Sequence, residues 1–201
     1  MSMPGFDTKS ITYFHNPGKE NTDKTLELAA EYAEKNGIKK IVVATYSGET
    51  ALRLSEISKD KQIIAVTLHA GTTKQERKAA WEGNLERLKA KGIECCRGVQ
   101  ALSGVERAMC KRYGGVFPLM IFVDALKLFS EGVKVCVEVT LMAADAGLVS
   151  PEEDILAIAG TGGGCDTALL IKPAYTTDVF SMGIKEIICI PKQVGVIHEP
   201  R

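Results

Sequence analysis

Two apolar runs of strand length constrain the fold more than any other feature of this chain. Residues 40–45 and 62–67 are almost continuous in apolar side chains, as in parallel strands that are covered on both faces. Segments with helical spacing follow them at about 49–58 and 74–91. This alternation of strands and helices predicts an α/β fold with a three-layer, doubly wound and mostly parallel sheet.

The flanking segments continue the same order of elements. We expect further strands at 11–14, 93–96, 154–159, 166–172 and 186–190, and helices at about 21–36, 101–113 and 119–129. Ser103 and Glu106 have the spacing of a capping box. The sequence does not decide whether the run 133–140 is a strand or a helix. Its alternating valines indicate a strand, while the following residues 141–146 indicate a helix. At 201 residues, we expect a single domain, 1–201, with a loosely ordered tail at 1–10.

Composition narrows the class of protein. The 25 basic and 25 acidic side chains give a formal net charge of zero, which argues against nucleic acid or a membrane surface as the main partner. The six cysteines include no C-x-x-C pair, so we expect small buried hydrophobes in a reducing compartment. Neither a signal-peptide pattern nor a stretch of about 18 apolar residues occurs, and we expect a cytoplasmic protein. No residues have metal-ligand spacing.

The turn that follows the run 40–45 is the main candidate for a binding site. Ser47 is a good N-cap residue, and Gly48 would let the backbone come close to a ligand. The start of a helix offers unpaired N–H groups and a positive dipole end, which favour a phosphate. Glu49 would be unfavourable beside a phosphate unless it faced solvent or a sugar hydroxyl. The alternative interpretation is an ordinary capped turn between a strand and a helix.

The carboxyl ends of parallel strands predict which loops meet. Ligands of doubly wound sheets bind beyond these ends, so the segments 45–50, 67–71 and 160–164 should share one crevice. The last is a glycine-rich loop that could equally be a hairpin turn, and Asn21, at another helix start, is favoured as a simple cap. The candidate cofactor-binding residues are Asn21, Thr45, Tyr46, Ser47, Gly48, Glu49, Thr50, Thr67, Gly71, Thr161, Gly162, Gly163, Gly164 and Thr167.

Three titratable residues could do chemistry, but a structural role is favoured for each. Glu138 and Asp145 are seven residues apart, so they would share a face of a helix. We favour paired structural acids over an acid/base pair. His69 follows a predicted strand end and could be a general base, although a structural or solvent-facing side chain is favoured. His15 and His198 are scattered, and the sequence supports no Ser/His/Asp set.

Several motifs together resemble a known family. Segments 41–51 and 62–67 resemble the C-terminal α/β domain of pyruvate kinase, where a Thr-x-Ser-Gly turn precedes a helix and an Ile-Ile-Ala-Val-Thr strand. The loop at 160–167 resembles that domain's glycine-rich effector loop more loosely. The segments 17–22, 47–51, 101–107 and 142–147 are similar to a small stand-alone, mostly archaeal family built on the same domain. This resemblance implies that 133–146 is helical and that the crevice holds FMN.

The resemblance also limits the expected function. Pyruvate kinase carries its substrate, metals and catalytic lysine on a separate barrel domain, so we expect no kinase activity. Tyr46 stands where a basic residue is often found, and the turn has no lysine or arginine. These differences favour a monophosphate such as FMN over a sugar bisphosphate. The alternatives are a regulatory module that senses a sugar phosphate or another phosphorylated metabolite, and a flavin-dependent oxidoreductase. We also expect a homo-oligomer, a dimer or higher.

Overall fold

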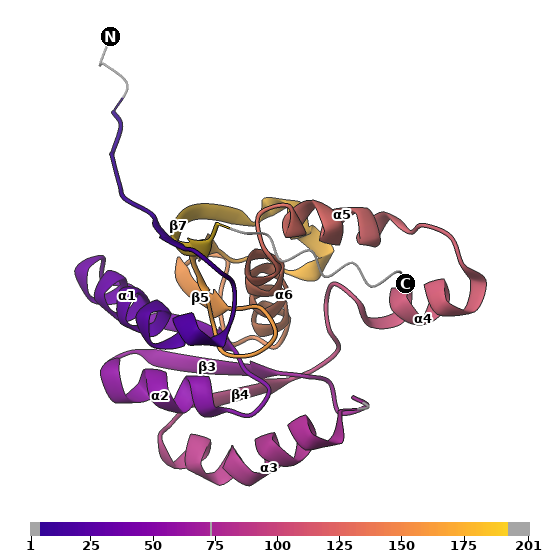
Figure 1. Cartoon of the computed structure of the whole chain (residues 1–201), viewed down its shortest axis with the longest axis horizontal. Coiled ribbons are helices and arrows are strands. Elements are labelled where there is room, and N and C mark those ends of the chain that lie inside the picture. Colours follow the sequence, from indigo (N-terminus) through magenta and orange to yellow (C-terminus); the bar gives the residue numbers. More distant parts are fainter. Residues whose placement is uncertain (1–4, 73, 193–201) are drawn as a thin grey trace.

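The chain forms one mixed sheet with helices on both of its faces (Figure 1). The computed structural model describes residues 5–72 and 74–192. The seven strands are ordered β1-β7-β6-β5-β2-β3-β4. Their bounds are β1 (Thr12–Phe14), β2 (Lys40–Ala44), β3 (Gln62–Thr67), β4 (Glu94–Arg97), β5 (Ile155–Ala159), β6 (Thr167–Lys172) and β7 (Gly183–Pro191).

All strand pairings are parallel except those of β6. This strand runs antiparallel to both of its neighbours, β5 and β7, whereas β2 is parallel to β3 and β5. The reversal follows from the short loop at 160–164, since a short loop joins antiparallel strands and a parallel pair needs a longer crossover. The predicted doubly wound, mostly parallel sheet is confirmed. The predicted strand at 166–172 begins one residue later, at Thr167.

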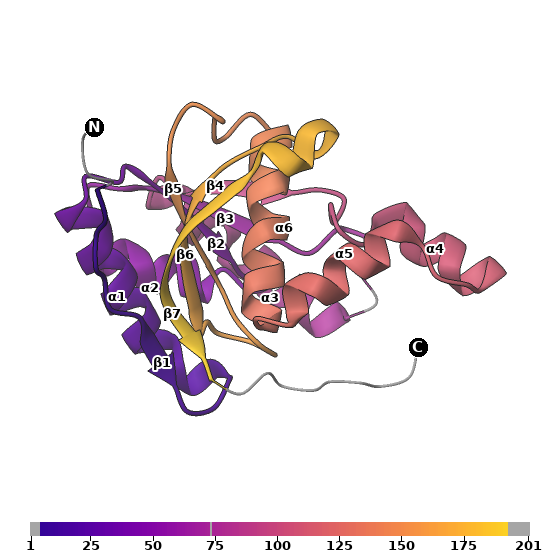
Figure 2. The ribbon, with the colours of Figure 1, turned by 90° about the horizontal axis from the view of Figure 1, so that it is seen from above.

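Helices make the two outer layers (Figure 2). The helices α1 (Thr22–Lys35), α2 (Glu49–Ile57) and α3 (Gln75–Ala90) cover one face of the sheet, and α6 (Glu131–Asp145) covers the other. The remaining helices are η1 (Lys19–Asn21), α4 (Gly104–Tyr113), α5 (Pro118–Lys127) and η2 (Thr176–Ser181). Ile41 and Val43 pack with α1–α3, and Val42 packs with α6, because successive side chains of a strand point to opposite faces. The continuous apolar run of β2 follows from this double coverage.

The structure makes the ambiguous run 133–140 part of α6. The hydroxyl of Ser130 caps this helix by accepting a hydrogen bond from the Val133 N–H at 3.0 Å. Val133 and Val139 pack against the sheet, while Val137 packs toward α5. A helix buried on nearly all sides needs apolar residues at most positions, so its valines also fit the pattern of a strand.

The predicted capping box is wrong. Ser103 makes no side-chain cap hydrogen bond at the start of α4. The Glu106 carboxylate instead accepts a hydrogen bond from the Leu119 N–H at 3.2 Å. Glu106 therefore connects α4 to the first turn of α5, a role that depends on the path of the chain between the two helices and not on local spacing.

The N-terminal segment is extended and exposed over its described part. Residues 5–10 belong to no helix or strand, yet the Lys9 ammonium pairs with the Glu186 carboxylate and lies over the Tyr32 ring. Residues 1–4 of the predicted tail, and His198, lie outside the described residues. Among the described helices, none combines the length and the apolar composition that a membrane crossing requires.

The cysteines behave as small hydrophobes. All six are free thiols. Cys96, Cys136, Cys165 and Cys189 are buried, and Cys95 and Cys110 are half-buried. Burial raises the pKa of the Cys165 and Cys189 thiols to about 12, so both are neutral thiols near neutral pH.

Candidate functional site

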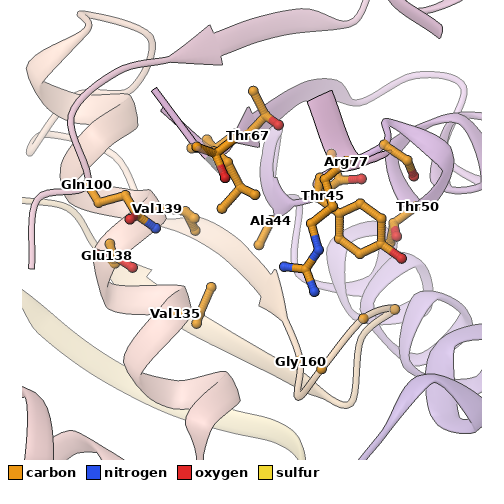
Figure 3. Close-up of a pocket in the computed structure, with 18 of the residues that line it drawn as sticks. Ala44, Thr45, Thr50, Thr67, Arg77, Gln100, Val135, Glu138, Val139 and Gly160 are labelled. Carbon is orange, nitrogen blue, oxygen red and sulfur yellow. The ribbon is translucent and has the colours of Figure 1, made fainter. Parts of the chain in front are cut away.

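A cavity of about 780 Å³ lies at the carboxyl edge of the parallel strands. The loops that follow β2 and β3 and the glycine-rich loop after β5 line it, together with one side of α6 (Figure 3). Its volume is in the range of small-molecule sites. The rule for doubly wound sheets therefore placed the three loops together correctly, although β5 and β6 form a hairpin there.

The turn between β2 and α2 is closed by its own side chains. The Gly48 N–H donates to Thr45 Oγ1 at 2.9 Å, and the Glu49 N–H donates to Ser47 Oγ at 3.3 Å. Gly48, with φ 89°, is the N-cap residue of α2. The prediction that Ser47 is the N-cap is wrong by one residue. Ser47 and Thr50 nevertheless both line the cavity, at the first turn of the helix.

Packing between α2 and α3 by itself accounts for a glycine at position 48. A Cβ at this position would lie 2.8 Å from Leu88 Cδ1 of α3, and its positive φ disfavours any other residue. Gly48 does not belong to the cavity lining. Its predicted role, close approach of the backbone to a ligand, stays a prediction, and the structure adds a close approach of α2 to α3 at this position.

The Asp166 side chain anchors the glycine-rich loop through hydrogen bonds. This carboxylate is fully buried. It accepts hydrogen bonds from the N–H groups of Gly18 and Thr161, at 3.0 and 3.2 Å, and from the Thr167 hydroxyl at 2.8 Å. The Cys165 N–H donates to Thr22 Oγ1 at 3.1 Å. The loop is therefore anchored both to the turn before η1 and to the first turn of α1.

The glycines of this loop have different reasons to be glycine. A Cβ on Gly164 would lie 2.2 Å from Thr22 Oγ1, so the loop could not reach α1 with a larger residue. Gly163 faces the Tyr46 ring, with Tyr46 Oη 3.5 Å from its Cβ position. Gly162, with φ 73°, has no described atom within 4 Å of its Cβ position. Gly162 is thus the loop residue with open space beside it.

Basic side chains surround the cavity although the turn itself has none. Those in the lining are Lys19, Arg53, Lys74, Arg77, Arg107 and Lys134. Arg77 of α3 lies over the Tyr46 ring, 4.7 Å from its centre. These residues come from five separate segments of the chain, which is why the local sequence of the turn gave no sign of them.

The acidic side chains of the lining are already paired. Glu49 pairs with Arg87 at 3.2 Å, and Glu131 pairs with Lys127 at 3.0 Å. Glu138 pairs with Lys134 at 2.5 Å, and Arg53 pairs with Asp23. Over residues 5–72 and 74–192, no carboxylate lies within ion-pair distance of the other four lining cations, which are Lys19, Lys74, Arg77 and Arg107. The cavity is therefore electropositive and suited to an anion.

The sequence pattern of the pyruvate kinase alpha/beta domain matches residues 23–171. The chain belongs to this family. Among solved structures, it is similar to an NH3-dependent NAD synthetase from Campylobacter jejuni in complex with the nitrate ion, with a TM-score of 0.37 and 12% sequence identity. That likeness covers 68% of this chain and 54% of the synthetase chain, and we draw no argument from it.

In this member of the pyruvate kinase alpha/beta domain family, most predicted site residues meet at the cavity. Those that line it are Thr45, Tyr46, Ser47, Glu49, Thr50, Thr67, Gly71, Gly162, Gly163 and Gly164. Four lie outside the lining: Asn21, Gly48, Thr161 and Thr167. The Asn21 amide donates to the Asn16 and Gly18 carbonyls at 2.8 and 3.2 Å, and Thr161 and Thr167 bind Asp166. These residues support the walls of the site.

The inner end of the cavity is mainly apolar. Ala44, Val66, Val135, Val139 and Met142 line it. The buried Lys134–Glu138 pair lies beside them, and the Glu138 carboxylate also accepts a hydrogen bond from the Leu102 N–H at 3.1 Å. Gln100 projects toward Glu138 from the opposite side (Figure 3).

Glu138 and Asp145 do not form an acid/base pair. Asp145 ends α6 and accepts hydrogen bonds from the Thr176 N–H and hydroxyl at 3.0 and 2.7 Å. It lies outside the cavity lining, whereas Glu138 lies within it. Glu138 is ion-paired with Lys134 and Asp145 is hydrogen-bonded to Thr176, which is consistent with the capped or paired structural acids favoured from the sequence. His69 lines the cavity mouth after β3, among the residues that the strand-end rule selects. Within the described part of the chain, no group of three or more His, Cys, Asp or Glu residues could hold a metal ion.

Proposed function

We propose that this chain binds a phosphorylated small molecule in the cavity, and that FMN is the ligand. One observation carries the proposal: a single cavity is lined both by cations that no carboxylate of the described residues pairs with and by apolar side chains. A phosphate would be attracted to the first, and a flat aromatic ring would lose water-exposed area on the second. FMN has both parts.

The phosphate is assigned to the start of α2. Ser47 and Thr50, with their hydroxyls, and Arg77, with its guanidinium, line the same cavity beside the positive dipole end of α2. Glu49, the acid that could oppose a phosphate, is turned toward α3. Its carboxylate accepts hydrogen bonds from Asn84 at 3.1 Å and from Arg87 at 3.2 Å, so its charge is compensated.

The ring is assigned to the inner end, between β2, β3 and α6. Ala44 and Val139 offer apolar surface there. The Gln100 amide and the Lys134 ammonium are the polar groups at its border, and they could donate hydrogen bonds to carbonyl oxygens of the ring. We make no assignment of a reaction; a flavin-dependent oxidoreductase stays an alternative, and kinase activity is not proposed.

A second candidate ligand is a sugar bisphosphate or a similar metabolite with two phosphates. It is favoured by the four lining cations that no carboxylate of residues 5–72 and 74–192 pairs with, because one phosphate monoester carries only about two negative charges. On this alternative the chain would be a regulatory module that senses a phosphorylated metabolite.

The absorbance spectrum of the freshly purified protein is the first test, and FMN titration followed by flavin fluorescence is the second. Arg77→Ala and Lys74→Ala should each weaken FMN binding, while Lys59→Ala, an exposed lysine outside the lining, should not. A lost charge-assisted hydrogen bond of about 1.5–3 kcal/mol corresponds to roughly a 10- to 150-fold weaker affinity. The affinity for riboflavin, which lacks the phosphate, should change little in either lining variant.

Three outcomes separate the candidates. FMN binding that falls with Arg77→Ala supports the flavin. A rise in melting temperature with fructose 1,6-bisphosphate, without any response to FMN, replaces it by the second candidate. A protein that is colourless and responds to neither compound refutes both.

A further inference from the structure

Helix α4 projects from the body of the molecule (Figure 1, Figure 2). The structure describes all of its ten residues, and none of them is buried. Val105, Met109 and Tyr113 follow each other at intervals of four, and they are 72%, 43% and 73% exposed. Residues at this spacing form one face of a helix. A helix of ten residues is not stable in water without packing, so this apolar face requires a cover.

A groove of about 790 Å³ lies between α1 and α2, on the opposite end of the molecule. Leu26, Ala30 and Ile57 give it an apolar floor, and the Ile57 side chain is 54% exposed. The acidic residues of its lining are Asp23, Glu27, Glu31, Glu34, Glu56 and Asp60. Only Arg53 and Lys61 are basic among the described residues that line it.

The two surfaces are complementary in charge and in polarity. Helix α4 has Lys111 and Arg112 in its last turn. Its other basic residue, Arg107, lines the cavity, and its one acid is Glu106. The groove lining has six acids and two bases, and Lys24 and Lys91 pair with two of these acids, Glu27 and Glu56. The acids therefore exceed the nearby cations by two. An amphipathic helix that lays its apolar face into an apolar groove is a common mode of recognition, and here the charged rims of helix and groove would attract each other.

We propose that α4 of one copy docks into the α1–α2 groove of a second copy. A chain cannot fill its own groove, because α4 and the two helices of the groove lie at opposite ends of the long axis (Figure 1). The contact is therefore head-to-tail. Such a contact closes into a ring or continues as a filament, depending on the rotation between neighbouring copies.

The competing arrangement pairs α4 with α4 about a two-fold axis. That arrangement would cover the apolar face of both helices, but it would bring two helices of net positive charge together. Like charges across an interface oppose association. The acidic groove offers the opposite sign, which is why we assign the second copy to the groove.

Light scattering during size exclusion gives the molar mass at several protein concentrations. We expect wild-type mass above the 21.7 kDa of one chain, and association that weakens as salt rises. The double variants Lys111→Glu/Arg112→Glu and Glu27→Lys/Glu31→Lys should each raise the concentration needed for association by about tenfold or more. Both pairs are exposed, so circular dichroism should remain that of the wild type.

The matched control is Glu82→Lys/Glu86→Lys, which places the same charge change at the same spacing on α3, away from both surfaces. Its molar mass should equal that of the wild type. Mixing the two charge-reversed variants is the sharpest test. The acidic α4 of the first variant matches the basic groove of the second, and the unchanged α4 of the second matches the unchanged groove of the first. The mixture should recover the wild-type mass.

Three results would overturn the proposal. A wild-type protein that stays a single chain at every concentration contradicts it. An oligomer that resists the groove variant but not the helix variant points to the α4–α4 arrangement. If each variant dissociates but their mixture does not regain the wild-type molar mass, α4 and the α1–α2 groove do not contact each other. None of these results bears on ligand binding, so this proposal and the proposed function fail separately.

Discussion

Replacing Asp166 tests how the glycine-rich loop is held in place. The Asp166 carboxylate is fully buried and accepts three hydrogen bonds, from Gly18, Thr161 and Thr167. Asp166→Ala removes the acceptor of all three and leaves two backbone N–H groups without a partner. Hydrogen bonds to a charged acceptor contribute about 1.5–3 kcal/mol each. Allowing for water that enters the space, we expect a loss of about 3–5 kcal/mol from the free energy of unfolding.

Asp166→Asn keeps the shape of the side chain and should cost less. Its single carbonyl oxygen can accept from both backbone N–H groups, and its amide can donate to the Thr167 hydroxyl. The three bonds remain but lose the contribution of the charge, so we expect a loss of about 1–2 kcal/mol. Urea unfolding measures both variants, with an unchanged slope against denaturant. An alanine variant that loses under about 1 kcal/mol, or one that equals the asparagine variant, would refute this account of the loop.

Two further predictions concern backbone packing and buried thiols. Gly48→Ala places a Cβ 2.8 Å from Leu88 Cδ1 and should lower the free energy of unfolding by about 2–4 kcal/mol. Gly37→Ala, with φ 65° but no described atom within 4 Å, should lower it by about 1–2 kcal/mol in the same urea experiment, and equal losses would contradict the Leu88 contact. Burial raises the pKa of Cys165 to about 12 from 9.0. The unfolded thiol therefore loses its proton first, and the stability that this thiol contributes is full below about pH 9 and is lost as pH rises toward 12. Relative to wild type, Cys165→Ala should remove up to about 1.4 kcal/mol per pH unit of that decline in the free energy of unfolding. Identical declines with pH in the two proteins would show that the pKa of this thiol is not raised by folding.

The layers of the fold could be predicted because strands with apolar side chains on both faces must be covered on both faces. Residues 40–45 and 62–67 are apolar on both faces, and such strands require helices on both sides. The same topology fixes where strand ends meet, so the loops after β2 and β3 could be assigned to one crevice without any side-chain geometry. The run 133–140 could not be assigned from its own residues, because α6 is covered by the sheet on one side and by α5 on the other.

The supports of the site could not be predicted, because they depend on contacts between distant segments. Asp166 has the sequence position of an ordinary strand residue, and only the path of the chain brings Gly18 to its carboxylate. Gly48 is informative only once Leu88 of α3 is known to lie beside it. In both cases the residue type is explained by a partner that is tens of residues or more away along the chain.

The charge of the site shows why local sequence can mislead about a ligand. A turn without lysine or arginine favoured a monophosphate, but Lys19, Lys74, Arg77 and Arg107 reach the cavity from three other segments. The zero net charge of the chain hides this, because acids collect elsewhere, above all in the α1–α2 groove. The cavity and the groove adjoin, because Arg53 lines both and pairs with Asp23 of the groove. Lys19, Lys74, Arg77 and Arg107 line the cavity and not the groove, so the ligand must be judged against these four cations. Because those cations exceed the charge of one phosphate, the FMN and bisphosphate titrations are decisive as a pair.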